Sequence, residues 1–153
     1  MYKAAVRWMI RRNIAHLNEG NYAPALAMFA EDATLTFPGD NTWARQYHEP
    51  GTGRDAVPTH RGRAEIEGFL RRYVDHGLQM RVEEIFVNGP PWNLRVAVCV
   101  QDWASGVDGR DLYANRAVLC IRSRWGRITA QEDYEDTERS AAFDRVLAAS
   151  SSG

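Results

Sequence analysis

The spacing of apolar residues predicts helices in the first half of the chain. From Tyr2 to Asn18 apolar residues recur every three or four positions, as on one face of a helix; they are Val6, Met9, Ile10, Ile14 and Leu17. Gly20 is suited to end this helix, because glycine readily adopts the left-handed conformation found there. A short second helix capped by Asn21 and a third helix over residues 63–76 are predicted next.

From residue 78 onward the period changes from helical to alternating. This pattern predicts four strands separated by breaks that are mostly rich in glycine; they cover residues 78–88, 94–103, 112–123 and 127–136. The short breaks indicate antiparallel pairing of consecutive strands. A further strand is predicted over residues 33–37, and a short final helix is expected to begin with Thr137 as its cap.

Helices followed by a meander of long strands are typical of an α+β fold. Because long strands twist and curl, we expect a cone-shaped, curved antiparallel sheet wrapped by three N-terminal helices, with a cavity near its wide end. Residues 1–149 are expected to form one domain and residues 150–153 a polar tail. Residues 39–61 are predicted to form a long loop, and loops of this length are often functional.

Charge and composition narrow the class of protein. The formal net charge of -1 gives no electrostatic reason to expect nucleic acid or a membrane as partner. No apolar run approaches the roughly 18 residues that a membrane span needs. Cys99 and Cys120 lie within apolar strands, which indicates buried free thiols rather than a secreted disulfide framework. We therefore expect a cytoplasmic protein.

The predicted strand over residues 94–103 carries the first candidate for chemistry. Its even positions are apolar from Leu94 to Val100, and the same row ends in the carboxylate of Asp102. In the next strand Asn115 is the polar member of an apolar row. In the last strand Asp133 alternates with its acidic neighbours, and a slip of one residue would turn it to the opposite face.

Two interpretations of these polar residues remain open. If Asp102, Asn115 and Asp133 share the concave face, they form an acid–base group, because an apolar surrounding raises a carboxyl pKa toward neutrality. Asp133 is then the best candidate acid or base, and Asp102 and Asn115 orient water or a carbonyl group. Alternatively, Asp102 begins a solvated turn and Asp133 belongs to an acidic surface run over residues 132–136.

Three segments of the chain resemble a known family. They are LNEGNYAPALAMFAEDATLTFPG at residues 17–39, HRGRAEIEGFL at residues 60–70 and GRITAQEDYED at residues 126–136. Each is similar to a stretch of the SnoaL-like proteins of the nuclear transport factor 2-like superfamily. The resemblance implies a cystatin-like α+β barrel. The superfamily includes ketosteroid isomerases, limonene-epoxide hydrolases, polyketide cyclases, dehydratases and non-catalytic proteins, so fold alone selects none of these functions.

The epoxide hydrolases of this superfamily match only in part. The resemblance places Asp133 at their last-strand catalytic aspartate and Asp102 near their other catalytic aspartate. Val100 stands where they carry an arginine, and Leu35 and Phe37 replace their first-strand tyrosine and asparagine. The two aspartates are therefore the part of that site which the resemblance carries over.

The ketosteroid isomerase pattern matches less well. Its general base falls at Phe37 and its first-helix tyrosine falls at Asn13, so the base is missing. The cyclases, by contrast, use an acidic residue on the sheet without a metal or organic cofactor. The resemblance therefore implies Asp133 as the catalytic acid or base and no cofactor.

The remaining candidate residues describe the expected ligand and partners. The residues expected to bind substrate are Asn13, Leu35, Phe37, Trp43, Tyr73, Asn115, Ala117 and Gln131. Trp43 lies in the long loop, where it either covers a ligand or anchors the loop. The histidines lack the spacing of metal ligands, so no metal is expected. The expected ligand is a small apolar or carbonyl-bearing molecule, and a homodimer through the outer sheet face is expected.

Three functions remain open at this point. The first is a cofactor-independent enzyme of the cyclase, isomerase, dehydratase or epoxide-hydrolase type. The second is a non-catalytic binder of an apolar metabolite, and the third is a dimeric accessory module. Carboxyl groups that converge in a closed cavity would favour the first function.

Overall fold

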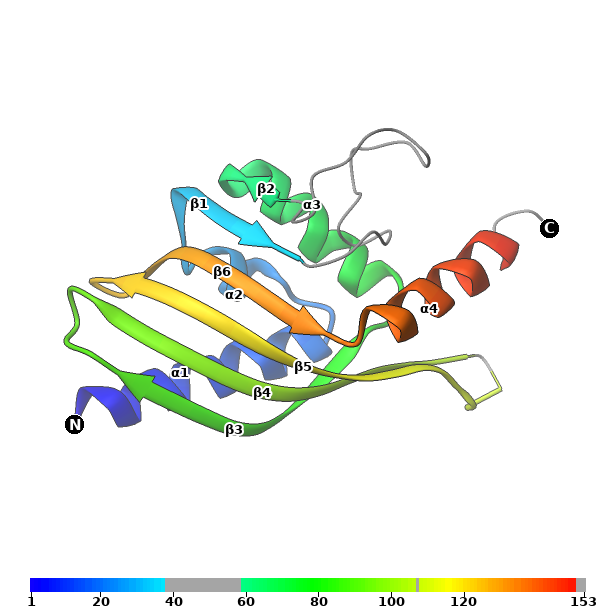
Figure 1. The fold of residues 1–153 in the computed structure, drawn as a ribbon, viewed down its shortest axis with the longest axis horizontal. Coiled ribbons are helices and arrows are strands. Elements are labelled where there is room, and N and C mark those ends of the chain that lie inside the picture. The colour runs from blue at the N-terminus through cyan, green and yellow to red at the C-terminus, as the bar shows by residue number, and fades with distance from the viewer. Residues whose placement is uncertain (38–58, 107, 151–153) are drawn as a thin grey trace.

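The computed structural model describes residues 1–37, 59–106 and 108–150 (Figure 1). Trp43 and most of the predicted loop over residues 39–61 lie outside these ranges. The elements are α1 (Tyr2–Asn18), α2 (Ala23–Leu26), β1 (Phe29–Thr36), β2 (Thr59–Arg61), α3 (Gly62–Asp75), β3 (Gln79–Asn88), β4 (Leu94–Ser105), β5 (Asp111–Arg124), β6 (Arg127–Glu135) and α4 (Thr137–Ser150).

The strands form one curved, unclosed sheet in the order β2-β1-β6-β5-β4-β3. The predicted antiparallel meander is confirmed for β3 to β6. The pair β1 and β6 is parallel, because the chain crosses between them through the helices and the other strands. The predicted α+β class is therefore confirmed, with an open sheet that contains one parallel pair.

The helices cover the inner face of the sheet. Helix α1 packs along β3, and α3 packs against β1 and β2, as Figure 1 shows. Helix α4 packs on β5 and has 14 residues, so the prediction of a short final helix underestimated it. Its alanine-rich sequence favours continuation of the helix.

Alternation along β4 decides which face is inside. Leu94, Val96, Val98 and Val100 are all buried, whereas Arg95 is exposed. The apolar row that ends in Asp102 therefore faces the helices, which decides between the two interpretations that the alternation left open. This orientation places a carboxyl group at the inner end of the row.

A bulge in β6 changes the pattern of its inner face. Ser123 pairs with Ile128 and Arg122 pairs with Ala130, so the strand register skips Thr129. An extra residue reverses the alternation beyond it. As a result Ile128 and Asp133 are both buried on the inner face, although strict alternation would place them on opposite faces.

The start of α4 is fixed by Asp136 rather than by Thr137. A carboxyl oxygen of Asp136 accepts hydrogen bonds from the backbone N–H groups of Glu138 at 3.1 Å and Arg139 at 3.3 Å. Asp136 therefore satisfies N–H groups that the first helical turn leaves unpaired. The predicted cap was one residue too late.

Loss of this cap is expected to destabilise the protein. Asp136→Ala should lower the free energy of unfolding by about 1 kcal/mol, measured by urea denaturation. Thr137→Ala is the matched control and should change it by no more than a few tenths of a kcal/mol. The opposite ranking of the two variants would show that Thr137 caps the helix after all.

Candidate functional site

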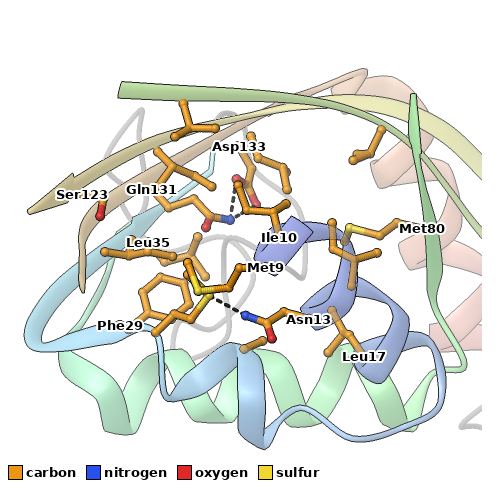
Figure 2. Close-up of a pocket in the computed structure, with 18 of the residues that line it drawn as sticks. Met9, Ile10, Asn13, Leu17, Phe29, Leu35, Met80, Ser123, Gln131 and Asp133 are labelled. Carbon is orange, nitrogen blue, oxygen red and sulfur yellow. Dashed lines mark hydrogen bonds between the residues drawn. The ribbon is translucent and has the colours of Figure 1, made fainter. Parts of the chain in front are cut away.

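A cavity of about 450 Å³ lies between the inner face of the sheet and the helices. Figure 2 shows Asp133 and Gln131 among apolar side chains such as Ile10, Leu35 and Phe29. Its volume lies within the range of roughly 300 to 1,000 Å³ that is usual for small-molecule sites. The closely packed core therefore leaves room for a ligand.

The cavity runs along the strands and is polar mainly at one end. It is lined by Leu94 near the start of β4 and by Asp102 eight residues further on, which a strand separates by about 26 Å. Most of the wall is apolar. The acidic and phenolic side chains on its wall are those of Tyr2, Tyr73, Asp102, Tyr113, Asp133 and Glu135. All except Tyr2 lie close enough to one another to interact electrostatically, with Asp133 level with Val98 in the strand register, and we refer to these five residues as the acidic end.

Asp133 is a buried acid on the cavity wall. Its side chain is only 7% exposed, and the Gln131 amide donates to its two carboxyl oxygens at 2.9 Å and 3.2 Å. Burial raises the pKa of Asp133 to about 8, and the nearby Glu135 and Asp102 add to this effect while the hydrogen bond from Gln131 opposes it. The acid is therefore mostly protonated at neutral pH. The alternative placement of Asp133 on the surface is wrong, because the side chain is buried.

Asp102 occupies a different electrostatic setting at the end of the β4 row. The Tyr113 hydroxyl donates to its Oδ2 at 3.2 Å, whereas its buried Oδ1 has no hydrogen-bond partner within residues 1–37, 59–106 and 108–150. Burial raises the pKa of Asp102 to about 6, and hydrogen bonds from Tyr113 and the backbone limit the rise. Asp102 is therefore mostly ionised at neutral pH, while Asp133 is mostly neutral. Two carboxyl groups kept in different protonation states are the usual arrangement for a base and an acid.

Tyr113 connects Asp102 to the last helix. Its ring stacks on Phe143 of α4 at 4.7 Å, and its hydroxyl lies 3.4 Å from Ser140 Oγ. Burial and the charges of Asp102 and Glu135 raise the pKa of Tyr113, so the phenol keeps its proton and remains a donor to Asp102.

Asn115 hydrogen-bonds to Tyr113 and does not line the cavity. It pairs with Asp102 across β4 and β5, as expected for neighbouring strands. Its amide donates to the Tyr113 hydroxyl at 2.9 Å and to the Asp136 carbonyl at 3.0 Å. The expectation that Asn115 contacts a ligand is therefore not met by its placement, because these groups already use its amide.

The other predicted site residues lie on the wall of the cavity, except for one that lies outside the described ranges. Six of them line the cavity: Asn13, Leu35, Phe37, Tyr73, Ala117 and Gln131. Trp43 belongs to residues 38–58, which are not described. Their roles in binding remain predictions.

Sequence reasoning did not select Tyr113, Glu135 or Ser140. Tyr113 lies two residues before Asn115 on the same strand face, so the alternation of β5 already carried a signal for it. The place of Ser140 depends on how α4 packs, which no local pattern records.

Among residues 1–37, 59–106 and 108–150, no group of three or more histidine, cysteine, aspartate or glutamate side chains is placed to hold a metal ion. No helix there combines the length and the apolar character needed to cross a membrane.

The family can be assigned from the sequence. A family model described as the SnoaL-like domain matches residues 10–131, well over half of the chain. The chain belongs to the SnoaL-like domain family. No curated protein matches it.

Solved structures share the fold of this SnoaL-like protein. Bal32a, from a soil-derived mobile gene cassette, has a TM-score of 0.68 and 19% identity over 91% of this chain and 95% of its own. An NTF2-like protein from Burkholderia pseudomallei K96243 has a TM-score of 0.63 and 21% identity over 86% of this chain and 91% of its own.

One structural neighbour is named for its chemistry. SalBIII, called an epoxide hydrolase/cyclase-like enzyme with a role in pyran ring formation in polyether salinomycin, has a TM-score of 0.64. It is 16% identical over 90% of this chain and 95% of its own. At these identities the likeness establishes the fold of this SnoaL-like chain and leaves its chemistry to the residues of the cavity.

The raised pKa of Asp133 predicts how stability depends on pH. Because the folded state holds this proton more tightly than the unfolded chain, the stabilisation is full below the unfolded pKa of roughly 3.9. It is lost as the pH rises through the folded pKa of about 8. Asp133→Asn mimics the neutral acid and should therefore remove this loss.

Urea denaturation of wild type and Asp133→Asn at pH 5, 7 and 9 measures the effect. From pH 5 to pH 9 the free energy of unfolding of the variant should rise relative to that of the wild type by several kcal/mol, as an order of magnitude. Asp75→Asn, at an exposed position of α3, is the matched control and should track the wild type. If Asp133→Asn follows the wild type at every pH, Asp133 does not bind its proton more tightly in the folded state.

Proposed function

We propose that this protein is a cofactor-independent enzyme that performs acid–base chemistry on a small apolar or carbonyl-bearing molecule. The observation that carries the proposal is the pair of carboxyl groups on one cavity wall, the buried Asp133 and the half-buried Asp102, with pKa values raised to about 8 and about 6. At neutral pH Asp102 is able to accept a proton while Asp133 is able to donate one.

The proton transfers follow from this difference. Asp102 Oδ1, which no described residue hydrogen-bonds, accepts a proton from a C–H or O–H bond of the substrate. Asp133 donates its proton to the oxygen on which negative charge develops. The substrate loses one proton and gains one, and a proton returned from Asp102 to Asp133 through solvent or product restores the site. The apolar wall strengthens both interactions, since little water screens them.

This scheme fits the reactions that the sequence suggested. Cyclisation, isomerisation, dehydration and epoxide opening all combine removal of a proton with protonation of an oxygen. The family assignment and the description of SalBIII as epoxide hydrolase/cyclase-like support this group of reactions without selecting one.

A non-catalytic binder is the second candidate function. The mainly apolar lining of the cavity favours it, because such a wall binds an apolar metabolite without chemistry. A dimeric accessory module is disfavoured, because a filled core would favour that function and the core here contains a cavity of about 450 Å³. Retention of two raised carboxyl pKa values at the acidic end is more useful to an enzyme than to a binder.

We also propose that the outer sheet face forms a homodimer. Phe86 and Tyr134 are 52% exposed there, and such aromatic side chains are often covered by a partner. This part of the proposal concerns assembly and is independent of the acid–base chemistry. We retain a cytoplasmic location as an expectation.

The pH dependence of turnover tests the proposed chemistry. Epoxides, lactones, polyketide-like aromatics and steroids form the substrate panel, and kcat/KM of the best substrate is measured from pH 4 to 10. The profile should be bell-shaped, rising with an apparent pKa near 6 and falling near 8.

Substitution of each carboxyl group tests the same chemistry. Asp133→Asn and Asp102→Asn should each lower kcat/KM by roughly 10² to 10⁴. The exposed control Asp75→Asn should retain it. Full turnover by both cavity variants would sink the enzyme proposal, and binding without turnover by the wild type would support the binder instead.

A further inference from the structure

Two buried polar atoms at the acidic end have no hydrogen-bond partner among the residues that the structure describes. They are the hydroxyl of Tyr73 on α3 and Oδ1 of Asp102 on β4. Both residues line the cavity. The unpaired atoms of Tyr73 and Asp102 are therefore a property of the cavity.

The ring of Tyr73 is held in place by packing, although its hydroxyl has no hydrogen-bond partner among the described residues. Its side chain is only 6% exposed, and its ring packs near Phe69 with centroids 6.2 Å apart. Burial raises the pKa of Tyr73, and the charges of Asp102, Tyr113 and Asp133 add to the rise, so its hydroxyl keeps the proton. A buried polar atom that remains unpaired destabilises the folded protein, so its retention calls for an explanation.

The two atoms have complementary hydrogen-bonding roles. The Tyr73 hydroxyl has a proton to donate, while the ionised Asp102 carboxylate only accepts. A hydroxyl group on a ligand both accepts and donates, so one such group complements the roles of both atoms. A carbonyl or ether oxygen only accepts and leaves Asp102 unpaired, and a hydrocarbon leaves both unpaired.

The rest of the wall describes the remainder of the ligand. Away from the acidic end the cavity is lined mainly by apolar side chains, and it reaches Val6 on α1 and Ile128 at the start of β6. This part of the cavity suits a rigid or extended apolar body. Polar substituents there would find few partners and would lose their hydration.

We propose that Tyr73 and Asp102 form a recognition pair for the hydroxyl group of an elongated, otherwise apolar substrate. This inference rests on the proposed function and specifies it, because the proton that Asp102 accepts is then that of a hydroxyl. Tyr73 holds the oxygen of the same group. The pair selects an alcohol, phenol or enol over the matching ether and hydrocarbon.

A matched series of probes tests this selectivity by binding alone. The probes are 2-naphthol, 2-methoxynaphthalene and naphthalene, and their dissociation constants are measured at pH 7 by calorimetry. The naphthol should bind about tenfold more tightly than the ether, and the ether about tenfold more tightly than the hydrocarbon, since each step adds one buried hydrogen bond.

Substitutions assign each step to one residue. Tyr73→Phe should abolish the preference for the ether over the hydrocarbon, and Asp102→Asn should weaken the preference for the naphthol over the ether. Tyr22→Phe is the matched control, because the Tyr22 hydroxyl bonds to Glu67 at 3.2 Å and the residue does not line the cavity. It should retain both preferences.

A stability measurement separates recognition from a structural role. Since the Tyr73 hydroxyl has no hydrogen-bond partner in the described part of the chain, Tyr73→Phe should not lower the melting temperature without ligand. A clear fall in melting temperature would assign the hydroxyl to the fold and overturn the proposal.

The remaining outcomes also decide the question. Equal affinity of the three probes, retention of both preferences by Tyr73→Phe, or no binding of any probe would each overturn the recognition pair. Equal affinity would leave the proposed enzyme standing, because its own test is the turnover of Asp133→Asn and Asp102→Asn. Loss of selectivity and loss of catalysis are therefore read from separate experiments.

Discussion

The cost of removing carboxyl groups from water is the constraint on which the arrangement of this site depends. A carboxylate in an apolar cavity is strongly disfavoured unless it is hydrogen-bonded or neutralised. Asp133 meets this constraint by holding its proton, with a pKa raised to about 8. Asp102 meets it in part through the hydrogen bond from Tyr113, which keeps its pKa near 6. Burial therefore gives the two carboxyl groups different pKa values, so that Asp133 is an acid and Asp102 a base at neutral pH.

Much of the surrounding structure serves to hold Tyr113 in place. Asn115 donates to its hydroxyl and to the carbonyl of Asp136, and the carboxyl of Asp136 caps α4. Helix α4 in turn supplies Ser140 and the ring of Phe143 against which Tyr113 stacks. The final helix is therefore coupled to the ionisation of a cavity residue through a continuous set of hydrogen bonds and ring contacts. Tyr73 stands apart from this network, which is why its hydroxyl remains available to a ligand.

The sequence predicted the fold, and it named the two carboxyl groups of the site without settling which way they face. Alternation along β4 is unbroken and placed Asp102 in the same row as the apolar residues, but it did not decide whether that row faces the helices. In β6 the bulge at Thr129 breaks the alternation. Because a bulge depends on pairing with a neighbouring strand, the sequence did not decide whether Asp133 faces the helices or the outside. Asn115 was expected at a ligand because its row faces inward, but long-range contacts with Tyr113 and Asp136 use its amide. The unpaired atoms of Tyr73 and Asp102 are likewise a result of packing between distant segments.

The protonation state of Asp133 is the most direct test of this account. Carbon-13 NMR of the aspartate carboxyl groups, followed from pH 4 to 10, assigns the Asp133 signal by its loss in Asp133→Asn. The account predicts that this carboxyl titrates with a midpoint near 8 and that Asp102 titrates near 6. A midpoint close to the ordinary value of roughly 3.9 for Asp133 would show that the group is ionised at neutral pH, and the assignment of acid and base would be contradicted.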